Sequence, residues 1–540
     1  MASPSGDATQ AVLDGERIRS VEPRVRARTS IFISLVLLLG GALELVKNSA
    51  IAYYYGSGAE TDRFFAAYII PNTYSMFWVS SCLTGLVPLF AVWLRDSRED
   101  FARTIGGVVA VSTTLMAALA GVAYLAAPLV IKLLAPGFSK VDRLQTVHLF
   151  RGLSPVFALV GFTGVAIAVL NCHGKFLFAA SNKLFVNLFI LVGLFIGLGP
   201  LGIHWLVNLI VIGTLSYAAF LLLELWRSVH PQWGRTLAPE QTKMVLAGLS
   251  MPFFALIFRQ SSVLGERVIA SFLPAGSISE LSYSLQVVGG LTAIILTGVT
   301  MPQMPLFAHQ NSNAGKLGLL WQGIYYLLVV TLPLACGGYL LARPLVVILF
   351  RHGVFSMAAA DETARVFRAY AFGIVLSALA VQFQTPFWAD RRYATVIRHN
   401  GLVAGVNILL DLLLAPFFGV VGIAWGCTLA SAFSCLRMGW LVHKRYGSPL
   451  PQHGLRSALK PLVATLVMAA VVFEARAPIS GLLLSRPNVF YQEVFRAATL
   501  IGLGALAYVV SGFVQRMEPF PTLYRGAVSK LFVGRRPRGE

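Results

Sequence analysis

Apolar stretches, each about as long as a helix that crosses a bilayer, recur along the sequence. About fourteen such runs follow one another along the 540 residues, and a spanning helix needs about 20 apolar residues. Charged residues make up only 12% of the chain, whereas soluble domains carry about 25%. We therefore predict an all-α polytopic membrane protein. The composition excludes a series of soluble domains and disfavours a nucleic-acid-binding role for the net charge of +20.

The first run, 31–55, follows a basic stretch, but it is longer than the apolar region of a signal peptide and no small-residue cleavage site follows it. We therefore interpret it as a spanning helix and not as a signal peptide. In the second run, 64–94, Pro71 and Pro88 are expected to break the ends. The remaining predicted spans are 105–127, 153–170, 177–198, 203–225, 245–273, 278–302, 317–341, 366–388, 396–418, 420–442, 462–473 and 494–514.

The distribution of basic residues predicts the orientation of these spans. If the N-terminus is cytoplasmic, the helices alternate and a basic residue within three residues of the end of a span is counted with the adjoining segment, the cytoplasmic segments hold 26 Lys and Arg and the opposite side holds 12. Cytoplasmic loops of membrane proteins carry an excess of Lys and Arg. We therefore expect a multi-pass protein of the bacterial inner membrane with both termini in the cytoplasm.

A weak internal repeat divides the chain into two copies of a six-helix unit. Ala52–Gly58 matches Ala270–Gly276 at an offset of 218 residues, and Asn187 matches Asn407 at 220. Six is even, so the copies are parallel, and such two-lobed carriers bind substrate between the lobes and work by alternating access. The predicted segments are a basic tail (1–30), an N-lobe (31–226), a linker (227–243), a C-lobe (244–446), two extra helices (447–515) and a basic tail (516–540).

Charged residues inside the spans indicate where a substrate could bind, because such charges are costly in lipid. Glu44 and Lys47 share one face of the first span, and Arg259, Ser262 and Glu266 share one face of the seventh. These helices occupy equivalent places in the two repeats. We therefore predict a polar central cavity lined by these residues. The alternative is that the charges only hold neighbouring helices together.

The eleventh span carries a second polar pair, Asn407 and Asp411, four residues apart on one face. Carboxylate, amide and hydroxyl oxygens suit a hard cation, and Thr428 on the next span is a further candidate ligand. The pattern is compatible with a Na⁺ or H⁺ site in the second lobe. An aspartate satisfied by neighbouring helices explains it equally well.

Signals for catalysis are weak. Glu60 and Asp62 resemble the acidic pair of membrane glycosyltransferases, but their loop is too short for a catalytic platform. The sequence has no CxxC pair, no i, i+4 histidine pair and no phosphate loop of the Walker type. We therefore expect no catalytic residue, no ATP hydrolysis and no cofactor other than Na⁺ or H⁺ as a coupling ion.

Several short motifs then resemble the MurJ/MviN family of lipid II flippases. The resemblance covers about residues 30–450, and its motifs are modest singly but follow the family's order and spacing. They are Tyr55-Gly56-Ser57-Gly58, Thr61-Asp62-Arg63-Phe64-Phe65, Ile70-Pro71-Asn72, Leu134-Ala135-Pro136-Gly137-Phe138 and Ala270-Ser271-Phe272-Leu273-Pro274.

The resemblance implies the fold of the multidrug/oligosaccharidyl-lipid/polysaccharide exporter superfamily and a groove for the lipid tail formed by the last two helices. It places Lys47 and Gln286 at positions of the substrate cavity where the family carries arginine. It also implies a sodium site in the second lobe. The candidate ligands of that site are Glu266, Asn407, Asp411 and Thr428.

The expected function is that of a non-enzymatic flippase driven by an ion gradient or the membrane potential. Its substrate would be an undecaprenyl-diphosphate-linked glycan, either lipid II for peptidoglycan or an exopolysaccharide or surface-glycan repeat unit. Membrane lipids and a polymerase or glycosyltransferase of the same pathway are the expected partners, and nucleic acid is not. The alternatives are a cation-coupled exporter of drugs or other amphiphiles, and a membrane glycosyltransferase or polymerase.

Overall fold

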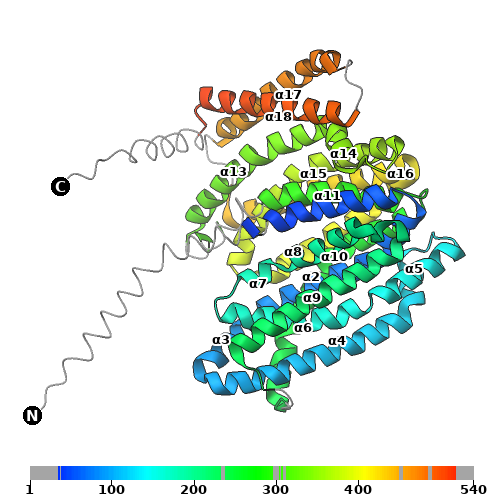
Figure 1. Ribbon diagram of the computed structural model, residues 1–540. Coiled ribbons are helices and arrows are strands. Elements are labelled where there is room, and N and C mark those ends of the chain that lie inside the picture. Colours follow the sequence, from blue (N-terminus) through cyan, green and yellow to red (C-terminus); the bar gives the residue numbers. More distant parts are fainter. Residues whose placement is uncertain are drawn as a thin grey trace, which may run out of the picture. The chain divides into compact units, whose positions relative to one another are not determined.

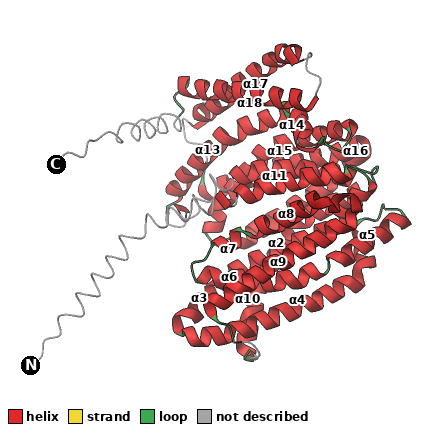
Figure 2. Cartoon of the chain, viewed as in Figure 1, coloured by secondary structure: helices red, strands yellow, loops and turns green. Residues whose placement is uncertain are grey.

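The structure, a computed structural model, describes residues 35–36, 38–232, 237–295, 303, 306–307, 310, 312–448, 454–483 and 489–517. In these segments every regular element is a helix, and none is a strand (Figure 2). Ten of the described helices are long and apolar enough to cross a membrane. A helix satisfies its own backbone hydrogen bonds, which lipid cannot do for it. The predicted all-α polytopic membrane fold is confirmed.

The described helices gather into two compact units. Among the described residues, unit 1 comprises those within Met1–Lys47, Tyr74–Val122 and Gly152–Phe253, and unit 2 comprises those within Asn48–Thr73, Ala123–Arg151 and Phe254–Glu540. Residues 48–73 and 123–151, which the sequence repeat places in the first lobe, pack with the second half of the chain. The predicted lobe boundaries at 226 and 244 stay a prediction.

The elements of the first half of the chain begin with a helix at 38–55, followed by α2 (Ala59–Ser81), the π-helical turn η1 (Cys82–Leu86), α3 (Val87–Asp96), α4 (Arg98–Leu134), α5 (Lys140–Leu153), α6 (Pro155–Cys172), α7 (Leu177–Ala180), α8 (Asn182–Gly193), the turns η2 (Leu194–Leu198) and η3 (Gly199–Leu201), and α9 (Ile203–Val229).

Within unit 1, small residues let helices approach closely. A Cβ on Gly161 would lie 2.5 Å from Cβ of Met116, and the Trp78 indole donates to the carbonyl of Gly161 at 3.3 Å.

The second half of the chain contains α10 (Pro239–Ala270), α11 (Ser277–Ile295), α13 (Asn313–Leu340), α14 (Ala342–Phe350), α15 (Met357–Ala389), α16 (Tyr393–Tyr446), α17 (Gly454–Leu483) and α18 (Val489–Val514), as Figure 1 shows. Ser312 and Ser356 cap α13 and α15 by accepting from backbone N–H groups of the first turn. Gly419, with φ 59° and ψ −140°, divides α16 into two helices, as predicted from the runs 396–418 and 420–442.

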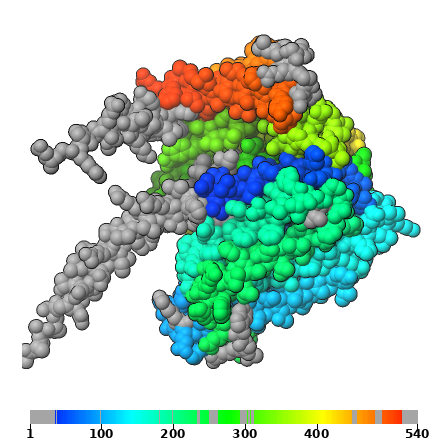
Figure 3. Space-filling model, viewed as in Figure 1, coloured from blue at the N-terminus to red at the C-terminus, as the bar shows by residue number. Residues whose placement is uncertain are grey.

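Unit 2 has a core of aromatic and aliphatic side chains from α11, α14 and α15. Tyr283, Phe350 and Phe367 are fully buried there. The C-terminal helices α17 and α18 pack against each other and against α13, and they form a continuous orange-to-red layer in the space-filling view (Figure 3). These last two helices, which follow the repeat, therefore belong to the body of unit 2.

Several helices are longer than the apolar runs that predicted them. The predicted run 105–127 becomes α4, Arg98–Leu134, and the short run 462–473 becomes α17, Gly454–Leu483. Residues 98–104 and 454–461, which include several polar side chains, extend α4 and α17 at their N-terminal ends. Pro71 was expected to end a helix but lies inside α2. The end of the predicted span 278–302, from residue 296 to 302, lies outside the described residues.

Candidate functional site

Three helices of unit 2 bring together a buried polar cluster. Glu266 comes from α10, Tyr370 from α15, and Asn407 and Asp411 from the first half of α16. The Asn407 amide lies 3.3 Å from Oε1 of Glu266 and 3.3 Å from Oδ2 of Asp411, so one NH₂ group serves two carboxylates. The Tyr370 hydroxyl lies 3.5 Å from Oε2 of Glu266. All four side chains are buried.

The cluster also presents oxygen atoms that lack a partner in the described part of the chain. Asn407 Oδ1 and Asp411 Oδ1 are buried there without a hydrogen-bond donor. Leaving such an atom unsatisfied costs about 1–3 kcal/mol. Carboxylate and amide oxygens are the ligand chemistry of a hard cation. The residues therefore fit the predicted Na⁺ or H⁺ site, which itself stays a prediction.

Two neighbours on the second half of α16 shape this cluster. Gly426 leaves room for Asp411, because a Cβ at this position would lie 2.0 Å from Oδ1 of Asp411. Thr428 is buried and donates to the carbonyl of Ala369 at 2.7 Å, which fixes its hydroxyl while leaving the oxygen able to accept or to ligate. All four predicted ligands thus occur in unit 2.

Arg267, the residue after Glu266, is a buried charged residue for which the sequence predicted no role. Arg267 is buried and donates to the carbonyl of Ile278 at 2.9 Å. It lies within electrostatic range of Glu266 and of Asp62. The adjacent Glu-Arg pair inside a span was the signal that could have revealed it, since a buried arginine needs anionic neighbours.

Asp62 is buried and binds the start of α11. Its Oδ2 accepts from the Gly276 N–H at 2.7 Å, and its Oδ1 accepts from the Ser279 N–H at 2.7 Å and the Ser279 hydroxyl at 2.8 Å. A carboxylate at a helix N-terminus satisfies free N–H groups and complements the helix dipole. Gly276 has φ +104°, which favours glycine. Asp62 therefore has a structural role, which argues against the predicted alternative of a catalytic acidic pair.

The residues predicted to line a central cavity fall in different units. Glu44 pairs with Lys183 at 2.7 Å in unit 1, where the sequence suggested a partner in Lys47. Lys47 is itself buried and within electrostatic range of Glu44. Ser262 and Gln286 are half-buried in unit 2. The side chain of Arg259 lies outside the described residues, and the cavity stays a prediction.

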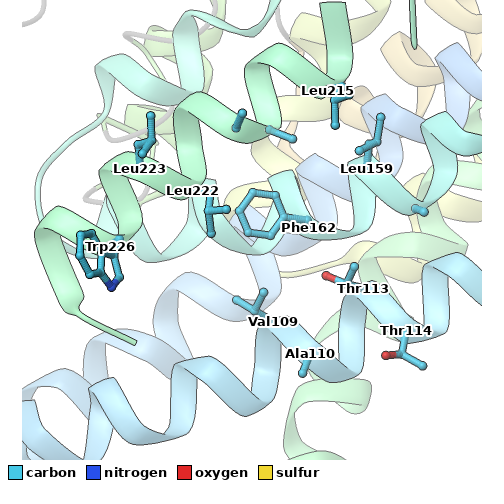
Figure 4. Close-up of a pocket in the computed structure, with 13 residues that line it drawn as sticks. Val109, Ala110, Thr113, Thr114, Leu159, Phe162, Leu215, Leu222, Leu223 and Trp226 are labelled. Atoms are coloured by element: carbon cyan, nitrogen blue, oxygen red, sulfur yellow. The ribbon is translucent and has the colours of Figure 1, made fainter. Parts of the chain in front are cut away.

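Unit 1 contains an apolar pocket of about 980 Å³ between α4, α6 and α9 (Figure 4). Phe162, Leu222 and Trp226 line it, and its polar side-chain groups are the hydroxyls of Thr113 and Thr114 and the indole N–H of Trp226. A pocket without a charged side chain suits hydrocarbon and does not suit a diphosphate. It is therefore not the predicted polar cavity.

Solved structures with a similar fold define the structural class. The chain superposes on a lipid II flippase MurJ in an inward closed conformation with a TM-score of 0.76 at 20% identity, covering 92% of this chain and 100% of that one. It also resembles an inward-facing multidrug transporter of the MATE family, with a TM-score of 0.61 at 11% identity over 75% of this chain and 94% of that one. The fold is that of transporters of the MOP superfamily.

The family follows from the sequence comparison. The family described as lipid II flippase MurJ matches residues 51–484, so the chain belongs to the lipid II flippase MurJ family. A probable lipid II flippase MurJ from Vibrio cholerae is 26% identical over 89% of this chain and 94% of its own length. The corresponding protein from Haemophilus influenzae is 26% identical over 87% of this chain and 96% of its own. The resemblance seen in the sequence is confirmed.

Proposed function

We propose that this protein moves lipid II from the inner to the outer leaflet of the bacterial inner membrane. The observation that carries the proposal is the family match across residues 51–484. A fold shared with transporters found in inward- and outward-facing conformations supports alternating access between the two faces. The substrate crosses unchanged, so the process requires binding and conformational change and no covalent step.

The buried charges suggest how such a substrate is held and how movement is driven. Lys47 is a buried cation inside a span, and a diphosphate supplies the negative charge that such a cation favours. The cluster of Glu266, Asn407 and Asp411 would bind Na⁺ or take up H⁺, so that an ion gradient biases one conformation over the other. The excess of basic residues in the predicted cytoplasmic segments supports an orientation with both termini in the cytoplasm.

A surface-glycan repeat unit on the same lipid carrier is the second candidate substrate. The observation that favours it is the replacement of arginine, expected from the family resemblance, by Lys47 and Gln286. Lysine keeps the charge but loses the planar fork that binds two oxygens at once. In either case the glycan reaches the outer face, where a polymerase or glycosyltransferase of the same pathway would consume it.

Depletion of the protein in its host tests the function. Lipid-linked intermediates are extracted and identified by mass spectrometry, with a plasmid copy of the wild-type gene as the control. We expect lipid II to accumulate on the cytoplasmic side. Accumulation of a different undecaprenyl-diphosphate glycan would support the second candidate. If no lipid-linked glycan accumulates and the cells grow normally, the flippase proposal is wrong.

A further inference from the structure

The polar cluster of unit 2 holds two buried acids, Glu266 and Asp411, which are 3% and 0% exposed. The Asn407 amide bridges them and carries no charge. Within the described residues, Arg267 is the cation that acts on Glu266, and no lysine or arginine pairs with Asp411. A buried charge without a counter-charge is strongly destabilising. The amount of positive charge at the cluster therefore decides which ions it can accept.

Arg267 holds its positive charge beside this cluster. It follows Glu266 on α10 and is 5% exposed. One guanidinium nitrogen donates to the carbonyl of Ile278 at 2.9 Å, which fixes the side chain against the start of α11. Its Nε atom is buried without an acceptor in the described part of the chain. An arginine stays protonated in proteins, so this charge is a permanent part of the site.

A second acid, Asp62, competes for the same arginine. Asp62 accepts from the Ser279 N–H, and Ser279 follows the residue that binds Arg267, so both side chains contact the same turn of α11. Asp62 is already held by three hydrogen bonds at the N-terminal end of that helix, where the helix dipole is positive. Glu266 acts on Arg267 more strongly than Asp62 does. Most of the compensation that Arg267 provides therefore goes to Glu266.

The cluster is left with one uncompensated negative charge. The carboxylates of Glu266 and Asp411 contribute two negative charges, and Arg267 contributes one positive charge. One Na⁺ or one H⁺ brings this total to zero, whereas a divalent cation such as Ca²⁺ leaves a buried positive charge. The same oxygen ligands suit both kinds of metal ion, and the number of charged ligands tunes the affinity of such sites. The charge balance, and not the type of ligand, therefore separates the two kinds of ion.

We propose that Arg267 makes the cation site of Glu266, Asn407 and Asp411 selective for monovalent ions, because it neutralises one of the two carboxylates. Arg267 does not ligate the ion and acts on it only through its charge. The inference rests on the proposed ion coupling and deepens it, since it names the residue that sets the charge of the coupling ion. It gives the adjacent Glu-Arg pair inside a span a role beyond holding α10 against α11.

Binding of Na⁺ and Ca²⁺ to the purified full-length protein in detergent tests the proposal. The melting temperature is followed by tryptophan fluorescence during titration with NaCl or CaCl₂, and choline chloride keeps the ionic strength constant. The shift at each concentration yields an apparent Kd for each ion, because an ion that binds only the folded state stabilises it. Arg267→Gln removes the charge and Arg267→Lys keeps it. The matched control is Arg365→Gln, which replaces an exposed arginine of α15 that pairs with Glu362.

We expect Na⁺, and not Ca²⁺, to raise the melting temperature of the wild type. In Arg267→Gln, which has two uncompensated carboxylates, Ca²⁺ should bind, and the ratio of the Na⁺ Kd to the Ca²⁺ Kd should rise at least about tenfold. The reason is that loss of a nearby positive charge favours a divalent ion twice as much as a monovalent one. Arg267→Lys and Arg365→Gln should keep the preference of the wild type.

A second pair of variants changes the charge balance without leaving two carboxylates unpaired. Glu266→Gln leaves Asp411 and Arg267 as a neutral set, so it should lose the response to Na⁺. The double variant Glu266→Gln/Arg267→Gln restores one net negative charge and should regain that response without responding to Ca²⁺. Such a rescue of Na⁺ binding by removal of the arginine does not follow from a purely structural role. This pair keeps the test decisive if Arg267→Gln alone does not fold.

Four results would overturn the proposal. Equal responses of the wild type to Na⁺ and Ca²⁺ would show that the site does not select by charge. An unchanged ion preference in Arg267→Gln, or in the double variant relative to Glu266→Gln, would reduce Arg267 to a contact between α10 and α11. A preference in Arg267→Lys like that of Arg267→Gln would assign the effect to the shape of the guanidinium. The absence of any response in the wild type and all variants would remove the cation site itself. Failure of the flippase proposal would instead be seen as an absence of accumulated lipid-linked glycan upon depletion, with these ion preferences intact.

Discussion

Replacing Asp62 should destabilise unit 2 more than any change at a neighbouring surface acid. The carboxylate is 4% exposed and accepts three hydrogen bonds at the start of α11. In Asp62→Ala the Gly276 and Ser279 N–H groups lose their acceptor. The Ser279 hydroxyl keeps one, since it also lies 2.9 Å from the carbonyl of Gly276.

The expected loss follows from these two orphaned donors. Each buried donor left unsatisfied costs about 1–3 kcal/mol, so Asp62→Ala should lower the free energy of unfolding by about 2–6 kcal/mol. Asp62→Asn can keep Oδ1 for Ser279 but turns an NH₂ group toward the Gly276 N–H. It should therefore cost about 1–3 kcal/mol, from one lost bond.

Equilibrium unfolding in mixed micelles with increasing SDS, followed by tryptophan fluorescence, measures both losses. Glu60→Ala is the matched control, because Glu60 is an exposed acid two residues away. Surface substitutions usually change stability by no more than about 0.5 kcal/mol. An Asp62→Ala variant within that margin of wild type would refute the assignment of Asp62 as the cap of α11.

Three further outcomes are expected. Lys47→Ala should abolish complementation of the depleted strain at normal protein levels, and Lys47→Arg should restore it; full activity of the alanine variant contradicts a cationic cavity. Asp411→Asn and Gly426→Ala, whose Cβ would displace the Asp411 carboxylate, should both remove Na⁺ or pH dependence of transport, measured in proteoliposomes; unchanged dependence argues against the ion site. Burial raises the pKa of Asp390, but its ion pair with Lys316 and its hydrogen bond from the Tyr446 hydroxyl lower the pKa overall. The stability it contributes is therefore present above its unfolded pKa of about 3.9 and declines as pH falls through the lower native value. Lys316→Gln should reduce the loss of thermal stability that occurs as the pH falls. An unchanged dependence of the melting temperature on pH would contradict the Lys316–Asp390 ion pair.

The sequence predicted the class of fold well because lipid imposes it. Apolar runs located the helices, and the break at Gly419 was found where a glycine separates two runs. Asn407 and Asp411 were found as a polar pair on one face of an apolar helix, and the family resemblance added Glu266 to them. The sequence did not predict the cap made by Asp62 or the pairing of Glu44 with Lys183. Those partners are 214 and 139 residues apart in the sequence. Helical spacing relates residues within one helix and does not predict contacts between residues so far apart in the sequence.

The division of the chain into two units has a mechanical consequence. The chain crosses between the units after Lys47, Thr73, Val122, Arg151 and Phe253, and each crossing lies within a helix. In four of the five a glycine or proline stands within two residues: Pro71, Gly121, Gly152 and Pro252. Bending is easiest where a helix lacks a hydrogen bond or a side chain. Any movement of one unit against the other would therefore bend these helices near the glycine and proline positions, and substitutions that stiffen the helices there should hold the protein in one conformation.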